Sequence, residues 1–333
     1  MTARIAVFGC KSTTTFLIEA IQARVPVDRV ITLSPASAER AQVADYLDCA
    51  AYCADRGIDH HVVDDYTLKD PADQELIRGF DLDLGFVMGW QRLIPAAVLD
   101  TFRVGVFGMH GSADDLPIGR GRSPMNWALI EQRPHFFTNL FRYDPGVDSG
   151  DVLDTLGFSI QPADTAETMH YKNSLAMKTL IYRNLDALLA GDVTLHKQRD
   201  AEPTYYPKRS PADSQIDFEQ DLASIEALVR AVAHPFNGAF TFVDGKRLTI
   251  WRAATFETDL VPFGFEDQPW GTIVEVFQTG KFLIKCRGGL LLVHEYEGDA
   301  TPAVGQRCVP VGLEQGKFER NADGYHDLPA PPG

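Results

Sequence analysis

The chain has 333 residues and a formal net charge of −15 at pH 7, with 45% hydrophobic and 23% charged residues. This length is enough for two domains, and the composition is that of a globular protein. The negative charge repels polyanions and disfavours general nucleic-acid binding. No apolar run reaches the roughly 20 residues of a membrane span, and no signal peptide is recognised, so we expect a cytoplasmic protein.

The first hundred residues alternate between apolar runs and helical patterns. Strands are predicted at 4–9, 27–33, 58–63 and 82–88, with a single long helix at 36–56 between the second and third. Shorter helices are predicted at 71–78 and 95–100. Such alternation favours an α/β fold with a doubly wound parallel sheet.

Two further strands end in polar loops. The first is followed by FGMHGS at 107–112, and the second, at 136–141, by DPGVDSGD at 144–151. His110 and Asp148 are thereby expected at neighbouring strand tips, where α/β sheets present ligand-binding groups. Such a pair can handle protons, although by residue type alone a structural His–Asp pair is the commoner case.

The second half of the chain has a different pattern. Residues 192–215 are polar and rich in proline and tyrosine, as in a linker. A helix at 222–233 precedes short strands at 239–243, 248–253, 271–276, 282–285 and 290–296, with Asp244-Gly245 as a hairpin turn. We therefore predict a domain at 1–191, a linker at 192–215, a small β-barrel domain at 216–320 and a tail at 321–333.

The five cysteines, among them Cys49 and Cys53, have no spacing typical of a zinc site. Cys49 and Cys53 are four residues apart on the predicted helix, which indicates one buried helix face. No metal is expected.

The sequence resembles the folate-dependent formyltransferases, specifically the branch that contains methionyl-tRNA formyltransferase, and within it most of all the sugar N-formyltransferases. The resemblance lies in the paired motifs at 107–124 and 144–151, in GWQRLIP at 89–95, in PMNWA at 124–128 and in HPFNGA at 234–239. It implies a Rossmann-like catalytic domain followed by an OB-like barrel. It also implies a formyl donor, 10-formyltetrahydrofolate, and an amine acceptor.

The family's catalytic group consists of an Asn, a His and an Asp. The resemblance carries the His to His110 and the Asp to Asp148. The Asn position is occupied by Gly108, which has no side chain to donate a hydrogen bond. A backbone N–H, Ser112 or Asn139 could serve instead, or the chemistry is altered or lost.

The resemblance also implies ligand contacts. The cofactor-binding candidates are Met88, Gly89, Trp90, Leu93 and Asp144. Met88 and Leu93 could equally be core residues, whereas Trp90, between Gly89 and Gln91, is harder to assign to a core. The substrate-binding candidates are Ser112, Arg120, Asn126 and Tyr143.

The acceptor is left open. The segment at 34–40 is nearly neutral where the tRNA enzymes carry a basic loop, and together with the net charge of −15 this makes tRNA the disfavoured partner. A small-molecule amine fits better, such as an amino sugar on a nucleotide or a modified amino acid. The alternatives are a methionyl-tRNA formyltransferase and a folate-binding protein without transfer activity. The oligomeric state is undetermined, a homodimer included.

Overall fold

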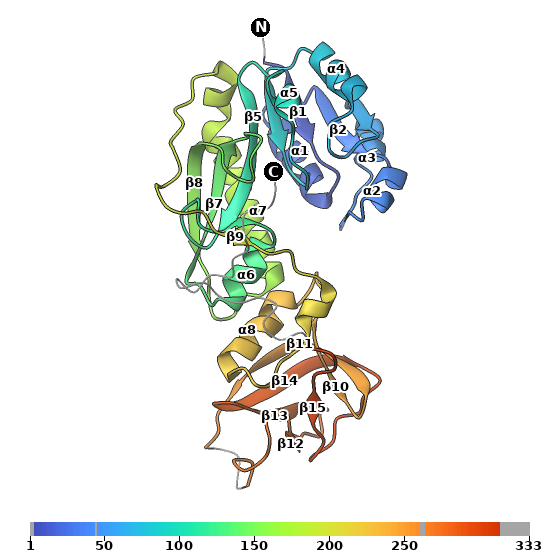
Figure 1. Ribbon diagram of the computed structural model, residues 1–333, viewed down its shortest axis with the longest axis vertical. Coiled ribbons are helices and arrows are strands. Elements are labelled where there is room, and N and C mark those ends of the chain that lie inside the picture. The colour runs from blue at the N-terminus through green and yellow to red at the C-terminus, as the bar shows by residue number, and fades with distance from the viewer. Residues whose placement is uncertain (1–2, 44, 260–263, 314–333) are drawn as a thin grey trace.

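The computed structural model describes residues 3–43, 45–259 and 264–313. Figure 1 shows two lobes arranged along the long axis, with α8 (Leu222–Val232) at their junction. No helix within the described ranges combines the length and apolar character needed to cross a membrane.

A mixed sheet of seven strands forms the first lobe, in the order β3-β2-β1-β4-β5-β7-β8. The strands from β3 to β5 are parallel, and β7 and β8 continue the sheet in antiparallel pairing. The apolar runs of the central strands β1, β4 and β5 are buried, as expected of a sheet covered on both faces. The bounds are β1 (Ile5–Phe8), β2 (Arg29–Leu33), β3 (His60–Val63), β4 (Leu84–Val87), β5 (Gly105–Ser112), β7 (His135–Arg142) and β8 (Val152–Ser159).

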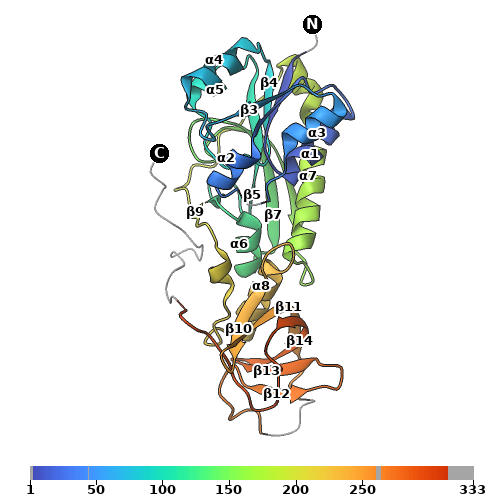
Figure 2. The same cartoon turned by 90° about the vertical axis from the view of Figure 1, so that its right-hand side faces the viewer.

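Helices cover both faces of this sheet, which confirms the α/β prediction. One layer contains α1 (Ser12–Gln22), α3 (Cys49–Arg56) and α7 (Ala166–Ala190), and the opposite layer contains α4 (Pro71–Gly79) and α5 (Ala96–Leu99) (Figure 2). Each layer has its own apolar cluster against the sheet. Cys49 and Cys53 are both fully buried in the first layer, as their spacing predicts.

The prediction of one helix at 36–56 is wrong. The structure has α2 (Pro35–Arg40), then a break, then α3. Gln42 and Asp45 adopt positive φ angles of 50° and 56°, which a continuous right-handed helix does not allow. Asp48 then starts α3, because its carboxylate accepts hydrogen bonds from the N–H groups of Ala50 and Ala51.

The second lobe is an antiparallel sheet of order β12-β13-β14-β11-β10-β15. An isolated bridge from Thr272, before β12, to Arg307, before β15, curls this sheet into a half-barrel. Asp244 and Gly245 both have positive φ angles, as the predicted hairpin turn requires. The bounds are β10 (Ala239–Val243), β11 (Lys246–Phe256), β12 (Ile273–Val276), β13 (Phe282–Cys286), β14 (Gly289–Gly298) and β15 (Cys308–Val309).

The segment at 192–215, predicted from the sequence to be a linker, packs against the first lobe. Its short strand β9 (Tyr205–Tyr206) pairs in parallel with β6 (Arg120–Gly121), and Tyr206 stacks on Trp127 of α6 (Pro124–Ile130) at 6.0 Å. A 3-10 turn, η1 (Pro211–Ser214), then leads toward α8. The division into 1–191, 192–215 and 216–320 stays a prediction, and the tail at 321–333 lies outside the described residues.

Candidate functional site

The site is built around β5 and β7, the strands at which the sheet changes from parallel to antiparallel. Their register sets Gly108 opposite Phe141 and His110 opposite Asn139. His110 is 8% exposed. The Asp144 to Gly150 turn follows β7 directly, so the two sequence motifs meet in space as predicted.

His110 and Asp148 lie together. Nδ1 of His110 is 3.4 Å from Oδ2 of Asp148, and Nε2 of His110 is 2.8 Å from the carbonyl oxygen of Gly119. Both neighbours are acceptors, so a proton on either ring nitrogen has a hydrogen-bond partner. A ring held in this way can take up and release a proton without rotating.

The turn that carries Asp148 is fixed by hydrogen bonds from two other segments. Asp148 has a left-handed backbone (φ 49°), and its Oδ2 accepts from the N–H of Gly121 at 2.9 Å. The Gln198 amide donates to the carbonyl oxygens of Asp148 and Gly150, at 2.7 and 2.9 Å. We call His110, Asp148, Arg120 and Gln198 the paired centre.

Arg120, a predicted substrate-binding residue, is part of this scaffold. Its guanidinium donates to Oε1 of Gln198 at 2.6 and 3.2 Å and to the hydroxyl of Tyr205 at 3.2 Å. These bonds join the loop before α6 to the 192–215 segment. The role predicted for Arg120 stays untested, and its observed contacts are with protein groups.

Three other candidates also have protein partners. The Ser112 hydroxyl donates to the Ile118 carbonyl at 2.6 Å, and the Asn139 amide donates to the His110 carbonyl at 3.3 Å. Asn126 donates to the carbonyl of Ala231 in α8 at 2.7 Å, so it joins the two lobes. Each of these side chains therefore spends at least one donor on a protein group.

The predicted folate loop is partly a core element. Trp90 is 6% exposed and packs edge-on against Tyr66 at 4.7 Å. Trp90, which the sequence made harder to assign to a core, is a core residue, because Phe8 and Tyr66 pack against its ring. Met88 is also buried, and Leu93 is 41% exposed.

The backbone conformation and close packing at position 89 explain why this residue is a glycine. Its φ angle is 75°, and a Cβ there would lie 2.7 Å from Thr14 Oγ1. The loop therefore approaches the start of α1 as closely as only glycine permits. Whether Met88, Gly89, Trp90 and Leu93 contact a cofactor stays a prediction.

A cavity of about 340 Å³ lies between α5, the start of β5 and the Asp144 turn. Val106 and Tyr143 form part of its wall, and Asp144 is the one predicted cofactor-binding residue that lines it. Asp144 also fixes its own turn, since it accepts from the Gly146 N–H at 3.0 Å and the Ser149 hydroxyl at 2.6 Å. The cavity thus adjoins the strand that carries His110.

Arg122 is under the electrostatic influence of Arg92 and Asp148, and Lys11 under that of Arg122; we call Lys11, Arg92 and Arg122 the cationic edge. Burial lowers the pKa of Arg122, and the charge of Arg92 lowers it further. Burial also lowers the pKa of Lys11, to which Arg122 adds, although Asp45 opposes the shift. Within the described part of the chain, none of the three forms an ion pair.

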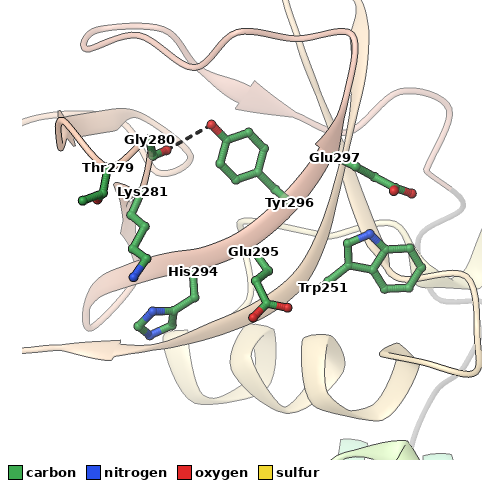
Figure 3. Close-up of a pocket in the computed structure, with 8 residues that line it drawn as sticks. All are labelled: Trp251, Thr279, Gly280, Lys281, His294, Glu295, Tyr296 and Glu297. Carbon is green, nitrogen blue, oxygen red and sulfur yellow. Dashed lines mark hydrogen bonds between the residues drawn. The ribbon is translucent and has the colours of Figure 1, made fainter.

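A second cavity, of about 320 Å³, lies on the second lobe (Figure 3). Trp251, Lys281, His294 and Tyr296 are among the residues that line it, and the Tyr296 hydroxyl donates to the Gly280 carbonyl at 3.0 Å. None of the sequence-predicted site residues belongs to it. The functional argument therefore stays with the first lobe.

Sequence reasoning missed Gln198 and Lys11. Gln198 lies in a polar stretch with no local pattern, 50 residues beyond Asp148. Lys11 follows the first strand and directly precedes α1. Its position at the carboxyl edge of a parallel sheet, where ligands bind, was the available signal.

Comparison with known proteins gives two family matches. Residues 3–184 match the family model described as formyl transferase, and residues 208–305 match the one described as formyl transferase, C-terminal domain.

Three solved structures share the fold. An N-formyltransferase from Helicobacter canadensis, in complex with folinic acid and dTDP-3-aminofucose, is 15% identical over 89% of this chain and 100% of that chain, with a TM-score of 0.64. WlaRD, a sugar 3N-formyl transferase in the presence of dTDP and 5-N-formyl-THF, is 15% identical over 88% and 97%, with a TM-score of 0.62. HypX from Aquifex aeolicus with tetrahydrofolic acid is 16% identical over 90% of this chain and 45% of that chain, with a TM-score of 0.59.

Proposed function

Because the chain belongs to the formyl transferase family, we propose that it transfers the formyl group of 10-formyltetrahydrofolate to the amine of a small anionic molecule. The family resemblance inferred from the sequence is thereby confirmed. The acceptor that fits best is an amino sugar linked to a nucleotide. The observation that carries this choice is the cationic edge beside Asp148.

The cationic edge supports an anionic acceptor for an electrostatic reason. Arg122 is desolvated and repelled by Arg92, and Asp148, whose charge opposes this repulsion, is already engaged with His110 and Gly121. A phosphate placed there would neutralise Lys11, Arg92 and Arg122 with charge-assisted hydrogen bonds. The chain as a whole carries a net charge of −15, so this local group of cations contrasts with the rest of the molecule and supports an anionic ligand.

The cavity beside β5 is the candidate donor site. Its volume of about 340 Å³ is in the range of small-molecule pockets. Val106, which lines the cavity, lies on β5, the strand that also carries His110. A folate head group in the cavity would bring its formyl group toward His110. The neighbours' folate ligands support a donor of this class.

The reaction then follows from the paired centre. The amine lone pair attacks the formyl carbon, and the C=O electrons move to the oxygen. Collapse of this adduct breaks the bond to N10, which receives the proton that the amine loses. His110, between Asp148 and the Gly119 carbonyl, is the group positioned to move that proton.

The experiment is an acceptor panel with 10-formyltetrahydrofolate, followed by the release of tetrahydrofolate. We expect turnover with a nucleotide-linked amino sugar, less with the free amino sugar, and none with its N-acetylated form. Efficient formylation of methionyl-tRNA at physiological salt, or no turnover with any amine, would overturn the proposal.

The donor site has its own matched test. Ala96 lines the cavity and the adjacent Ala97 does not. Ala96→Trp is expected to weaken binding of a folate analogue by about tenfold or more, since the indole fills the cavity. Ala97→Trp should leave binding within about twofold; equal effects of the two variants would place the donor elsewhere.

A further inference from the structure

Gly108 lies directly beneath the ring of Tyr143. A Cβ at position 108 would be 2.2 Å from Cε2 and 3.1 Å from Cζ of Tyr143. No side chain fits at 108 while the ring occupies this position. Gly108 has a regular strand conformation, paired with Val87 and Phe141, so the absence of a side chain serves the ring and not an unusual backbone turn.

The Tyr143 ring is held by its surroundings. Its backbone N–H donates to the Val106 carbonyl at 2.7 Å, and its ring stacks on Phe141 at 5.2 Å with an interplanar angle of 11°. One side of the residue faces the cavity that also contains Asp144. The ring therefore extends from the cavity wall to the strand that carries His110.

The Tyr143 hydroxyl is an uncommitted donor. It makes no hydrogen bond with any residue in the described ranges. Burial raises the pKa of this phenol, and the negative charge of Asp148 raises it further, so the hydroxyl keeps its proton at neutral pH. The ring lies over Gly108, two residues before His110 on β5, and this places the residue beside the paired centre.

The other donors near Gly108 are engaged. Ser112 is bonded to Ile118, Asn139 to His110, and the Nε2 of His110 faces the Gly119 carbonyl. The oxyanion formed by attack on the formyl carbon needs a preorganised donor. The Ser112 hydroxyl is thus committed, the Asn139 amide uses one of its two N–H groups, and the Tyr143 hydroxyl makes no hydrogen bond among the described residues.

We propose that Tyr143 is a catalytic residue whose hydroxyl donates a hydrogen bond to the formyl oxygen, in place of the amide that the family pattern has at position 108. This inference depends on the proposed function. The oxygen gains negative charge as the amine attacks and loses it when the bond to N10 breaks. Tyr143 donates throughout and keeps its proton, so it needs no partner of its own.

Gly108 and Tyr143 thus form one unit. An amide at 108 and a ring at 143 would compete for the same space, as the 2.2 Å approach indicates. The site therefore has either an Asn or a Tyr as its donor, and this chain has the Tyr.

Tyr143→Phe is the direct test, because it removes the hydroxyl and keeps the ring. The turnover number of the full-length protein is expected to fall about 100-fold or more, with little change in the KM for the formyl donor. A fall of less than about threefold would overturn the inference while leaving the proposed function intact.

A binding measurement tests the same bond without an acceptor. The wild-type protein should bind 10-formyl-5,8-dideazafolate more tightly than 5,8-dideazafolate, and Tyr143→Phe should lose this difference while its affinity for the unformylated compound is unchanged. An unchanged preference for the formyl group in Tyr143→Phe would refute the role of the hydroxyl. Binding of neither compound by the wild-type protein would refute the proposed function and this inference together.

The exchange of donors can also be tested. Gly108→Asn alone should lose turnover, because its side chain meets the ring of Tyr143. Adding Tyr143→Ala to this variant should raise its turnover number at least about tenfold. Removal of the ring makes room for the amide introduced at position 108, which can then act as the donor. A double variant no more active than Gly108→Asn would contradict the coupling of the two positions.

Discussion

The two sides of Asp148 differ in how their charges are balanced. In the paired centre, His110, Arg120 and Gln198 all have partners within about 3.4 Å. In the cationic edge, Arg92 and Arg122 repel each other and form no ion pair among the described residues. The partners of the first arrangement are all protein groups, whereas under the proposed function an anion would complete the second. The proposal therefore separates the side chains of the reaction from those that bind the acceptor.

The largest effect should come from the paired centre. His110→Ala and Asp148→Asn are each expected to lower the turnover number by about two to four orders of magnitude, because the proton of the attacking amine loses its acceptor. Steady-state kinetics would show this with nearly unchanged folate binding. If either variant changed only the acceptor KM, the division between the two sides would be wrong.

The next effect should come from the cationic edge. Arg122→Gln is expected to raise the acceptor KM by about 10- to 100-fold with little change in turnover number, because it removes a charge-assisted contact to the anion. Raising the salt concentration should weaken acceptor binding by the wild-type protein more than by the variant. Arg56→Gln, which removes an arginine packed on Tyr52 of α3, is the control and should be silent. A change in turnover number alone would assign Arg122 to the paired centre.

A smaller effect is expected for the support of Asp148. Gln198→Glu removes the two bonds that its amide donates to the Asp148 turn but still accepts from Arg120. We expect turnover to fall about tenfold with unchanged KM values, since the carboxylate is less well positioned. Arg199→Ala, at a half-exposed neighbour paired with Asp114 at 3.8 Å, should stay within about twofold. Equal losses in the two variants would indicate a general effect on the segment.

The smallest expected effect is a loss of folding stability at high pH, which sets an upper pH limit for comparing the paired centre with the cationic edge. Burial raises the pKa of Cys49, Cys286 and Cys308 to about 12. A raised pKa in the folded state favours the neutral thiol, so its contribution is complete below about pH 9 and is lost as the pH rises toward 12. The melting temperature should be flat from about pH 7 to 8.5 and should fall above about pH 9. A flat profile up to pH 11 would show that these thiols are not buried in solution.

The elements that could be predicted are those with a local signal. Local sequence patterns predict the apolar strands β1, β2 and β4 and the Asp244-Gly245 turn. The two motifs also predict that His110 and Asp148 lie together. The break between α2 and α3 escaped prediction because the sequence there keeps a helical pattern while two residues take positive φ. Propensity alone does not detect such a backbone reversal.

The contacts that could not be predicted are long-range. Nothing near Gln198 indicates that it holds Asp148, and nothing near Arg120 distinguishes it from Arg122. The structure engages the first arginine with protein partners and leaves the second without an ion pair among the described residues. Tyr143 was expected at the site, but its relation to Gly108 requires the register of β5 and β7.

The pairing of β6 with β9 has a consequence for protein synthesis. Arg120 and Tyr205 are 85 residues apart. The backbone N–H groups of Arg120 and Arg122 donate to the carbonyl oxygens of Thr204 and Tyr206. A nascent chain that has emerged only through β8 can form its central sheet, because domains fold as they leave the ribosome. Its reactive centre still lacks the strand that fixes the loop. The enzyme is thus assembled in a fixed order, and its activity can begin only after β9 has left the ribosome.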